Sequence, residues 1–448
     1  MCGRVGCVSF AVLAVGCAGF QLQPYDKIVW DTSERTQSLQ SHRPTGRTLN
    51  RAAMLPGRSQ ADIKPVLASL WQPSMRPSAW LNYNGLLATR YSQLDTPINP
   101  IFQPGELVVR HLGTETRVKY ISAFHAGRRL PLVVGTSGIN GTVDGKITMD
   151  ILQHLYDTGE FHVIHLEANT GVSHQVRNQR PFGGGFPEGL LLYETVAKLR
   201  ARTEFADQIN QVHLLGVSFG GMLSGLAAYC EGEFREGVID GAVLAFSPPF
   251  DLRVLFDNIA VLPIIHDRIH ESYLEEGMQR MKSYADFGND IRDAKQLDFD
   301  GYFRKVAVPH ARSIYPDLKA KLPDLAPLRN DDDVYAISSL RPFLNRLGVP
   351  FFYFYAYDDP VLSPQDHFHY VLAECPNPLV DGILLKDGGH LGYDTLSPST
   401  PGFTARVAER YFRYWSASQS LGNSTMPTIR RASSQAGSEI TSTLPSAK

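Results

Sequence analysis

The chain has 448 residues and carries 43 Lys and Arg against 45 Asp and Glu, a formal net charge of −2 at pH 7. Hydrophobic residues make up 43% of it and charged residues 20%, ordinary globular values that exclude wholesale disorder and collagen-like repeats. The nearly balanced charge, without a long basic stripe, argues against a nucleic-acid partner. Five cysteines are too few for a disulfide framework; Cys2, Cys7 and Cys17 crowd the first 17 residues, while Cys230 and Cys375 stand alone.

Residues 1–17 have the pattern of an export signal. Arg4 precedes an apolar and small-residue run over 5–16, which is shorter than the roughly 20 residues that a membrane span needs. Residues 13–17, LAVGC, are similar to a bacterial lipobox, which predicts a lipidated Cys17 and a protein anchored to a membrane of the cell envelope. An ordinary cleaved signal leading to a periplasmic or secreted protein, an uncleaved anchor and a wrongly assigned start are the alternatives.

The rest of the chain divides by composition. We expect a linker over 18–60, a folded body over 61–415 that begins with an N-terminal extension, and a disordered tail over 416–448. The tail prediction rests on 13 Ser or Thr in its 33 residues, too polar a segment to form a core.

Within the body, apolar runs alternate with helical periodicity from about residue 105. Two β-type runs, 106–112 and 116–124, are separated by Gly113 and Thr114, which predicts a hairpin. The runs that follow predict strands over 131–134, 161–166, 211–215 and 241–246, and helices over 147–156, 189–199 and 222–229. This alternation predicts an α/β fold with a mostly parallel central sheet flanked by helices.

A long interruption then separates two further strands. Residues 251–346 are mostly helical and charged, too long a stretch for a plain connection, so we expect a helical lid inserted before the next strand. Strand character resumes over 350–355 and 382–385, and a helix over 403–415 closes the body.

The strongest chemical signal is Gly-Val-Ser-Phe-Gly-Gly at 216–221. An apolar strand runs into it and a helical stretch leaves it, the strand–turn–helix setting of a nucleophile elbow. Ser218 would stand on a tight, strained turn above the sheet, and Gly216 and Gly220 would leave room for that turn. A plain glycine turn is the alternative interpretation.

A serine hydroxyl is a poor nucleophile near neutral pH, so Ser218 needs a base oriented by a carboxylate. Asp359 follows the strand at 350–355, and His390 follows the last strand within GGHLGY. Loops at the carboxyl ends of parallel strands are where an open α/β sheet builds its site. Asp358 is the alternative acid and Asp251 a weaker one.

The other histidines considered, His174, His213, His367 and His369, are interpreted as structural. A developing oxyanion needs preorganised donors, usually two backbone N–H groups. We expect one from Phe219 and one from the glycine-rich loop 135–141, with Thr136 as the first candidate and Ser137 as the second. The sequence shows no metal-ligand spacing and no phosphate-binding loop, so we expect neither a metal nor another cofactor.

Residues from about 105 to 415 resemble an α/β-hydrolase, most closely the YheT-containing branch of the AB-hydrolase superfamily. The resemblance rests on the elbow at 216–221, on Asp358-Asp359-Pro360, on 388–393 and on Asp-Phe-Asp at 298–300. It implies a Ser218, Asp359 and His390 triad in an esterase- or lipase-like enzyme. One departure is that Val134 stands where the family usually has a histidine before the oxyanion loop.

The sequence therefore predicts a serine hydrolase of carboxylic esters, including lipid esters, that works through an acyl-enzyme. An acyltransferase with the same triad and a noncatalytic surface binding protein on this scaffold are the alternatives.

Overall fold

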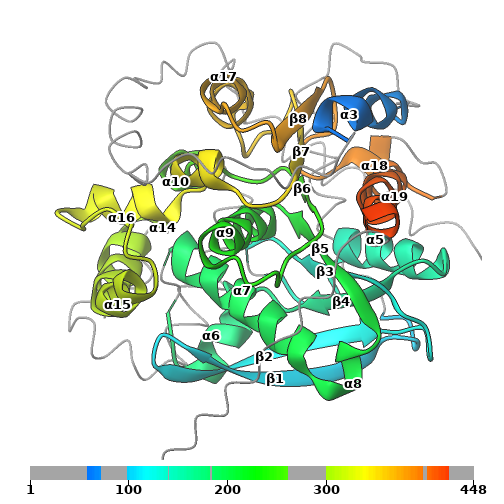
Figure 1. The fold of residues 1–448 in the computed structure, drawn as a ribbon. Helices are drawn as coiled ribbons and strands as arrows, with labels where there is room; N and C mark the ends of the chain where they lie inside the picture. The colour runs from blue at the N-terminus through cyan, green and yellow to red at the C-terminus, as the bar shows by residue number, and fades with distance from the viewer. Residues whose placement is uncertain are drawn as a thin grey trace, which may run out of the picture.

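The computed structural model describes residues 58–71, 98–139, 141–181, 184–260, 299–396 and 401–422. Its centre is an eight-stranded sheet in the order β1-β2-β4-β3-β5-β6-β7-β8 (Figure 1). The strands are β1 Gln103–His111, β2 Thr114–Ala123, β3 Leu130–Thr136, β4 His162–Leu166, β5 Ile209–Val217, β6 Val243–Phe246, β7 Phe351–Ala356 and β8 Val380–Leu385. β2 runs antiparallel to both of its neighbours, and β3 to β8 run parallel. The predicted α/β class is confirmed.

The first two strands form the predicted hairpin. His111 pairs with Thr114, so only Leu112 and Gly113 make the turn. Both have positive φ, 43° and 81°, as a two-residue turn that matches the twist of the strands requires.

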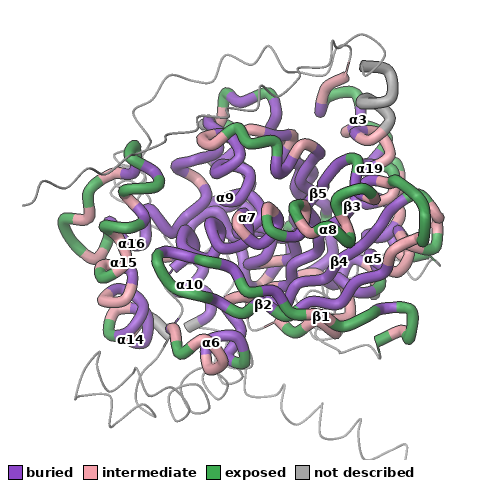
Figure 2. Tube along the Cα trace, turned by 60° about the horizontal axis from the view of Figure 1, so that its bottom comes forward, coloured by how far each residue is buried: buried purple, intermediate pink, exposed green. Residues whose placement is uncertain are grey.

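Helices cover both faces of the sheet (Figures 1 and 2). The strand side chains alternate between two cores. One core contains α7 (Gly185–Ala201) and α9 (Phe219–Phe234) and takes Phe351, Tyr353 and Tyr355 of β7. The other contains α5 (Lys146–Asp157) and α19 (Phe403–Gly422) and takes the intervening residues of β7. Because both faces are covered, the central strands are apolar throughout rather than alternating with polar residues.

The described part of the segment between β6 and β7 is helical. It comprises α10 Leu252–Ala260, α14 Phe299–Tyr302, the π-helix Phe303–Ala307, α15 Val308–Lys321, α16 Asp331–Ser338 and the 3-10 helix Arg341–Arg346. These helices share the core of α7 and α9. Asn258 of α10 donates from Nδ2 to the Val361 carbonyl at 2.9 Å, which ties the insertion to the loop after β7. Residues 261–298 lie outside the described part, and with them part of the predicted motif at 298–300.

The two ends of the body meet beside the edge strand β8. Helix α3 (Gln60–Ser69) packs on β8 and α19, and buried Gln60 donates from Nε2 to the Leu379 carbonyl and to the Tyr411 hydroxyl, at 2.9 and 3.2 Å.

Helix α19 extends to Gly422, past residue 415 where the sequence predicts the closing helix to end. Buried His213 holds the first of these extra residues through a 2.9 Å contact between its Nε2 and the Ser416 hydroxyl. The export signal with Cys17 and nearly all of the predicted linker and tail fall outside the described residues.

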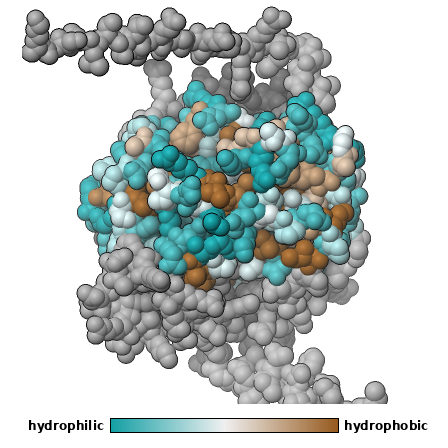
Figure 3. Space-filling model, turned by 90° about the horizontal axis from the view of Figure 1, so that it is seen from below, coloured by the Kyte–Doolittle hydropathy of each residue, from teal (hydrophilic) through white to brown (hydrophobic). Residues whose placement is uncertain are grey.

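The remaining described helices are short: α6 Val172–Asn178, α8 Thr203–Ala206, the π-helix Gln365–His369, α17 Tyr370–Glu374 and α18 Tyr393–Leu396. The face seen in Figure 3 is largely hydrophilic, with apolar residues in small scattered groups. None of the helices in the described ranges combines the length and apolar character needed to cross a bilayer.

Candidate active site

The predicted elbow lies between β5 and α9. Ser218 has φ 53° and ψ −124°, a strained conformation for a residue with a side chain. A Cβ on Gly216 would lie 2.4 Å from the Gly221 Cα, and one on Gly220 would lie 2.4 Å from the Thr136 carbonyl oxygen. Both positions therefore require glycine, because strand, turn and helix pass too close together for any side chain.

The structure brings the three residues of the predicted triad together. Ser218 Oγ lies 2.8 Å from His390 Nε2, and His390 Nδ1 lies 3.0 Å from Asp359 Oδ2. The carboxylate partner assigns the ring proton to Nδ1, which leaves Nε2 to accept the serine proton. Asp359 is fully buried, and its other oxygen accepts the backbone N–H groups of Val361 and Leu362 at 2.8 and 3.0 Å.

Asp358, the alternative acid, holds the opposite side of the histidine loop. Its Oδ1 accepts the backbone N–H of Gly389 at 2.8 Å, one residue before His390. Burial raises the pKa of Asp358 to about 6, and the neighbouring Asp387 and Asp359 add to this although the Gly389 N–H opposes it. Asp358 Oδ2 is buried without a hydrogen-bond partner among the described residues.

The weaker alternative acid has a structural position. Asp251 precedes α10, and its Oδ1 accepts the backbone N–H groups of Arg253 and Val254 at 3.0 and 3.3 Å. A carboxylate there satisfies the orphan donors of the first helical turn.

One expected oxyanion donor follows the serine in the chain, and the other ends the strand that pairs with β5. Phe219 is the first residue of α9, where the helix dipole is positive. Thr136 is the last residue of β3 and pairs with Gly216. The sequence analysis did not single out Gly138, yet a Cβ there would lie 3.1 Å from the Ser218 Cβ and 3.5 Å from its Oγ. Gly138 is therefore the part of the loop that borders the nucleophile.

The other histidines considered at the sequence level divide by exposure. His213 and His367 are fully buried, and burial lowers the pKa of each to about 3. His367 Nδ1 accepts the Phe250 N–H at 3.0 Å, whereas His369 is exposed.

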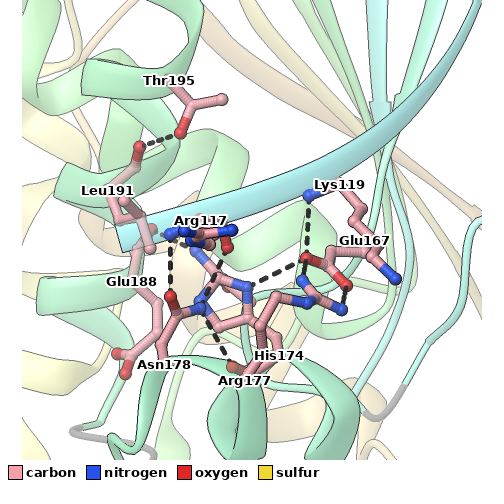
Figure 4. Close-up of polar contacts among 10 residues, drawn as sticks. Arg117, Lys119, Glu167, His174, Arg177, Asn178, Glu188, Leu191 and Thr195 are labelled. Carbon is pink, nitrogen blue, oxygen red and sulfur yellow. Dashed lines mark hydrogen bonds and ion pairs between the residues drawn. The ribbon is translucent and has the colours of Figure 1, made fainter. Parts of the chain in front are cut away.

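A buried ion network that the sequence analysis missed lies at the carboxyl end of β4 (Figure 4). Glu167 accepts the Lys119 N–H at 2.8 Å, contacts His174 Nδ1 at 3.3 Å and pairs with both guanidinium nitrogens of Arg177. Burial alone would raise the pKa of Glu167, but the bonds from His174 and Arg177 lower it to about 2.

The last residue of α6 completes this attachment. Asn178 Oδ1 accepts the Arg117 N–H at 2.7 Å, and its Nδ2 donates to the Arg117 carbonyl at 3.0 Å (Figure 4). The side chain thereby continues the ladder along β2 beyond the stretch that pairs with β4, which is 120–123. Helix α6 is thus held through the side chains of His174, Arg177 and Asn178.

No group of three His, Cys, Asp or Glu residues within the described ranges is arranged to hold a metal ion. Cys230 is buried within α9, and it is not joined to Cys375 by a disulfide.

The serine follows β5, the acid follows β7 and the histidine follows β8. This is the chain order of the α/β-hydrolases and differs from the orders of the chymotrypsin and subtilisin types. Together with the strained elbow and the mostly parallel sheet, it gives the chain the fold and the order of site residues that α/β-hydrolases have.

The chain is similar to known proteins at low sequence identity. No family model matches the chain. A Synechocystis sp. protein named "Putative esterase" is 26% identical over 191 residues, which are 41% of this chain and 50% of that protein. The chain therefore spans half the length of the curated relative that it matches.

Among solved structures, the Pyrococcus furiosus esterase Pf2001 is 14% identical, covering 72% of this chain and 96% of its own, with a TM-score of 0.41. The Pyrococcus horikoshii acylaminoacyl peptidase is 13% identical, covering 74% and 43%, with a TM-score of 0.40. The YheT-like branch stays a prediction.

Proposed function

We propose that the protein is a serine hydrolase that cleaves carboxylic esters through an acyl-enzyme. The observation that carries this proposal is the continuous hydrogen-bonded chain Ser218–His390–Asp359 on a strained elbow. Such a chain activates an otherwise weak hydroxyl nucleophile by giving its proton a destination. The name of the Synechocystis relative agrees with this class of reaction.

The reaction follows from the positions of the three side chains. Ser218 Oγ attacks the acyl carbon while its proton passes to His390 Nε2, and Asp359 stabilises the imidazolium that forms. The oxyanion is received by the N–H groups of Phe219 and Thr136. His390 then gives its proton to the leaving alcohol. In the second half it takes a proton from water as the water oxygen bonds to the acyl carbon, and it returns that proton to Ser218 Oγ as the acyl–Oγ bond breaks and the acid leaves.

The adjacent carboxylates provide a matched pair for the test. A fluorophosphonate probe should label the wild type and fail to label Ser218→Ala. Turnover of p-nitrophenyl esters should fall by roughly 10³- to 10⁴-fold in Asp359→Asn and far less in Asp358→Asn, which keeps its oxygen acceptor. His390→Ala should abolish turnover, whereas exposed His369→Ala should not. Equal labelling of wild type and Ser218→Ala would remove the proposal and favour a binding protein on a hydrolase scaffold.

The substrate class is a narrower part of the proposal. We expect acyl esters, including lipid esters, with the insertion between β6 and β7 setting acyl-chain preference because α10 is tied to the Asp359 loop. Turnover of esters of graded chain length, with products analysed in the presence of added alcohols, tests this and separates hydrolysis from acyl transfer.

The proposed membrane tether through Cys17 is tested separately, by palmitate labelling that is lost in Cys17→Ser.

A further inference from the structure

A buried polar cluster lies behind the loop that borders the nucleophile. Ser137 Oγ lies 2.9 Å from His165 Nε2 and 3.1 Å from Thr148 Oγ1, and His165 Nδ1 lies 2.8 Å from the Val143 carbonyl oxygen. Ser137, Thr148 and His165 are all buried, at 6%, 1% and 0% exposure. Three elements meet here, because Ser137 follows β3, Thr148 is in α5 and His165 is in β4.

The partners determine the direction of every hydrogen bond in this cluster. A carbonyl oxygen can only accept, so His165 Nδ1 carries the ring proton. Burial lowers the pKa of His165 to about 4, so the ring is neutral and its Nε2 is a bare acceptor. The Ser137 hydroxyl must therefore donate to Nε2, and Thr148 must donate to Ser137. Each of the three hydrogen bonds then has one donor and one acceptor, so the Ser137 hydroxyl has one orientation.

Packing keeps the Ser137 side chain in that orientation. A Cβ on Gly141 would lie 2.4 Å from the Ser137 Cβ, and a Cβ on Gly145 would lie 3.1 Å from its Oγ. The loop closes over the same residue, since the Gly141 N–H donates to the Gly138 carbonyl at 2.9 Å. The hydroxyl therefore faces the interior of the fold.

Ser137 joins the two residues that border the elbow. On one side, Thr136 is held by the last rung of the β3–β5 ladder, beside Gly216. On the other side, Gly138 lies against Ser218 and has no side chain with which to be held. The ladder ends at Thr136, so the side-chain bond of Ser137 to His165 is what continues the attachment of this backbone.

We propose that His165, acting through the Ser137 hydroxyl, is a positioning residue that holds the Thr136–Gly138 backbone in the orientation that receives the oxyanion. This inference rests on the proposed hydrolase function and assigns the cluster a part in it. A preorganised donor stabilises charge that develops only in the transition state, so a loosened loop slows acylation and leaves ground-state ester binding nearly unchanged.

Two substitutions of His165 separate its two hydrogen bonds. In His165→Asn the short amide reaches the Val143 carbonyl, in the place of Nδ1, but not Ser137. In His165→Gln the longer side chain places an amide oxygen near the position of Nε2, where it accepts from Ser137. Ser137→Ala removes the same bond from the loop side without adding volume.

His213→Asn is the matched control for burial. His213 is also fully buried, also contacts a serine hydroxyl at 2.9 Å, through Nε2 and Ser416, and also bonds to the backbone, where its Nδ1 accepts the Ala242 N–H at 2.9 Å. It lies on β5, five residues before the nucleophile, and it supports α19 rather than the loop. A purely structural histidine should behave in the same way as this control.

The experiment measures the single-turnover acylation rate, KM for a p-nitrophenyl ester, the rate of fluorophosphonate labelling and Tm. We expect Ser137→Ala and His165→Asn to slow acylation and labelling by about 10- to 100-fold with KM changed by less than about threefold. His165→Gln should recover most of the rate, and His213→Asn should lower Tm without changing the acylation rate of the folded protein.

Wild-type acylation rates in folded Ser137→Ala would overturn the inference and leave the hydrolase proposal standing. Equal acylation rates in His165→Asn and His165→Gln would also overturn the inference. This comparison is the deciding one if Ser137→Ala does not fold. An inactive, unlabelled wild type would instead remove the hydrolase function itself.

Discussion

Asp358→Asn should make the protein more stable above about pH 6 and leave it unchanged below about pH 4. Burial, assisted by Asp387 and Asp359, raises the pKa of Asp358 from 3.8 to about 6, so the folded protein binds this proton more tightly than the unfolded chain does. The stability gained from that proton is fully present below pH 3.8 and is lost as the pH rises through 6. Two pKa units correspond to about 3 kcal/mol in the free energy of unfolding.

Asparagine suits this position because it keeps the acceptor and has no proton to lose. Its Oδ1 can take the Gly389 N–H that Asp358 accepts at 2.8 Å, so the histidine loop keeps its support. Below pH 4 both side chains are neutral and neither satisfies the position of Oδ2, which is why the two proteins should then be equally stable.

Urea unfolding of wild type and Asp358→Asn between pH 4 and pH 9 measures this difference. The gap between the two free energies should open from near zero to about 3 kcal/mol, reaching half of that value near pH 5 and nearly all of it just above pH 6. Asp157→Asn makes the same substitution at an exposed position and is the control. A gap between wild type and Asp358→Asn that stays constant across the range would refute the raised pKa of the buried Asp358 carboxyl.

Three further substitutions test other parts of the site. Glu167→Gln should lower the free energy of unfolding at pH 7 by about 3 kcal/mol, because the pKa of Glu167 is lowered from 4.5 to about 2 in the folded protein. In urea unfolding repeated from pH 4.5 toward pH 2, the wild type should progressively lose this advantage. Gly138→Ala should cut kcat by about tenfold or more with Tm nearly unchanged, because its Cβ would lie 3.1 Å from that of Ser218. An unchanged kcat would show that the loop does not border the nucleophile. Gly220→Ala should lower the free energy of unfolding by about 3 kcal/mol or more, since its Cβ would lie 2.4 Å from the Thr136 carbonyl oxygen, and a folded variant with wild-type Tm would contradict that contact.

The sheet and the triad residues were predictable because their signals are local. Buried parallel strands are visible in the sequence as short apolar runs, and the elbow consists of six consecutive residues that follow one of these runs. Asp359 and His390 come directly after strands, and the carboxyl ends of parallel strands meet at one edge. The sequence favoured Asp359 and left Asp358 as the alternative. The structure distinguishes them, because Asp359 contacts the His390 ring whereas Asp358 accepts the Gly389 backbone N–H.

Features that depend on distant partners could not be predicted. His165 lies within an apolar strand, and its hydrogen-bond partner Ser137 is 28 residues away in the sequence. Helix α6 is seven residues long and largely polar, so it has no apolar periodicity to detect; Glu167 and Asn178 hold it in place. The end of α19 was missed for a related reason, since Ser416 reads as tail until His213 is brought beside it.

The packing of α3 against β8 and α19 has a consequence for how the protein is made. The bond between Gln60 and Tyr411 joins residues 351 positions apart. At ribosomal rates of about 5–20 residues per second, Gln60 waits about 20 to 70 s before Tyr411 is synthesised. Helix α3 therefore completes its packing long after it is made, and until then the face that it buries on β8 and α19 is open to other chains in the cell.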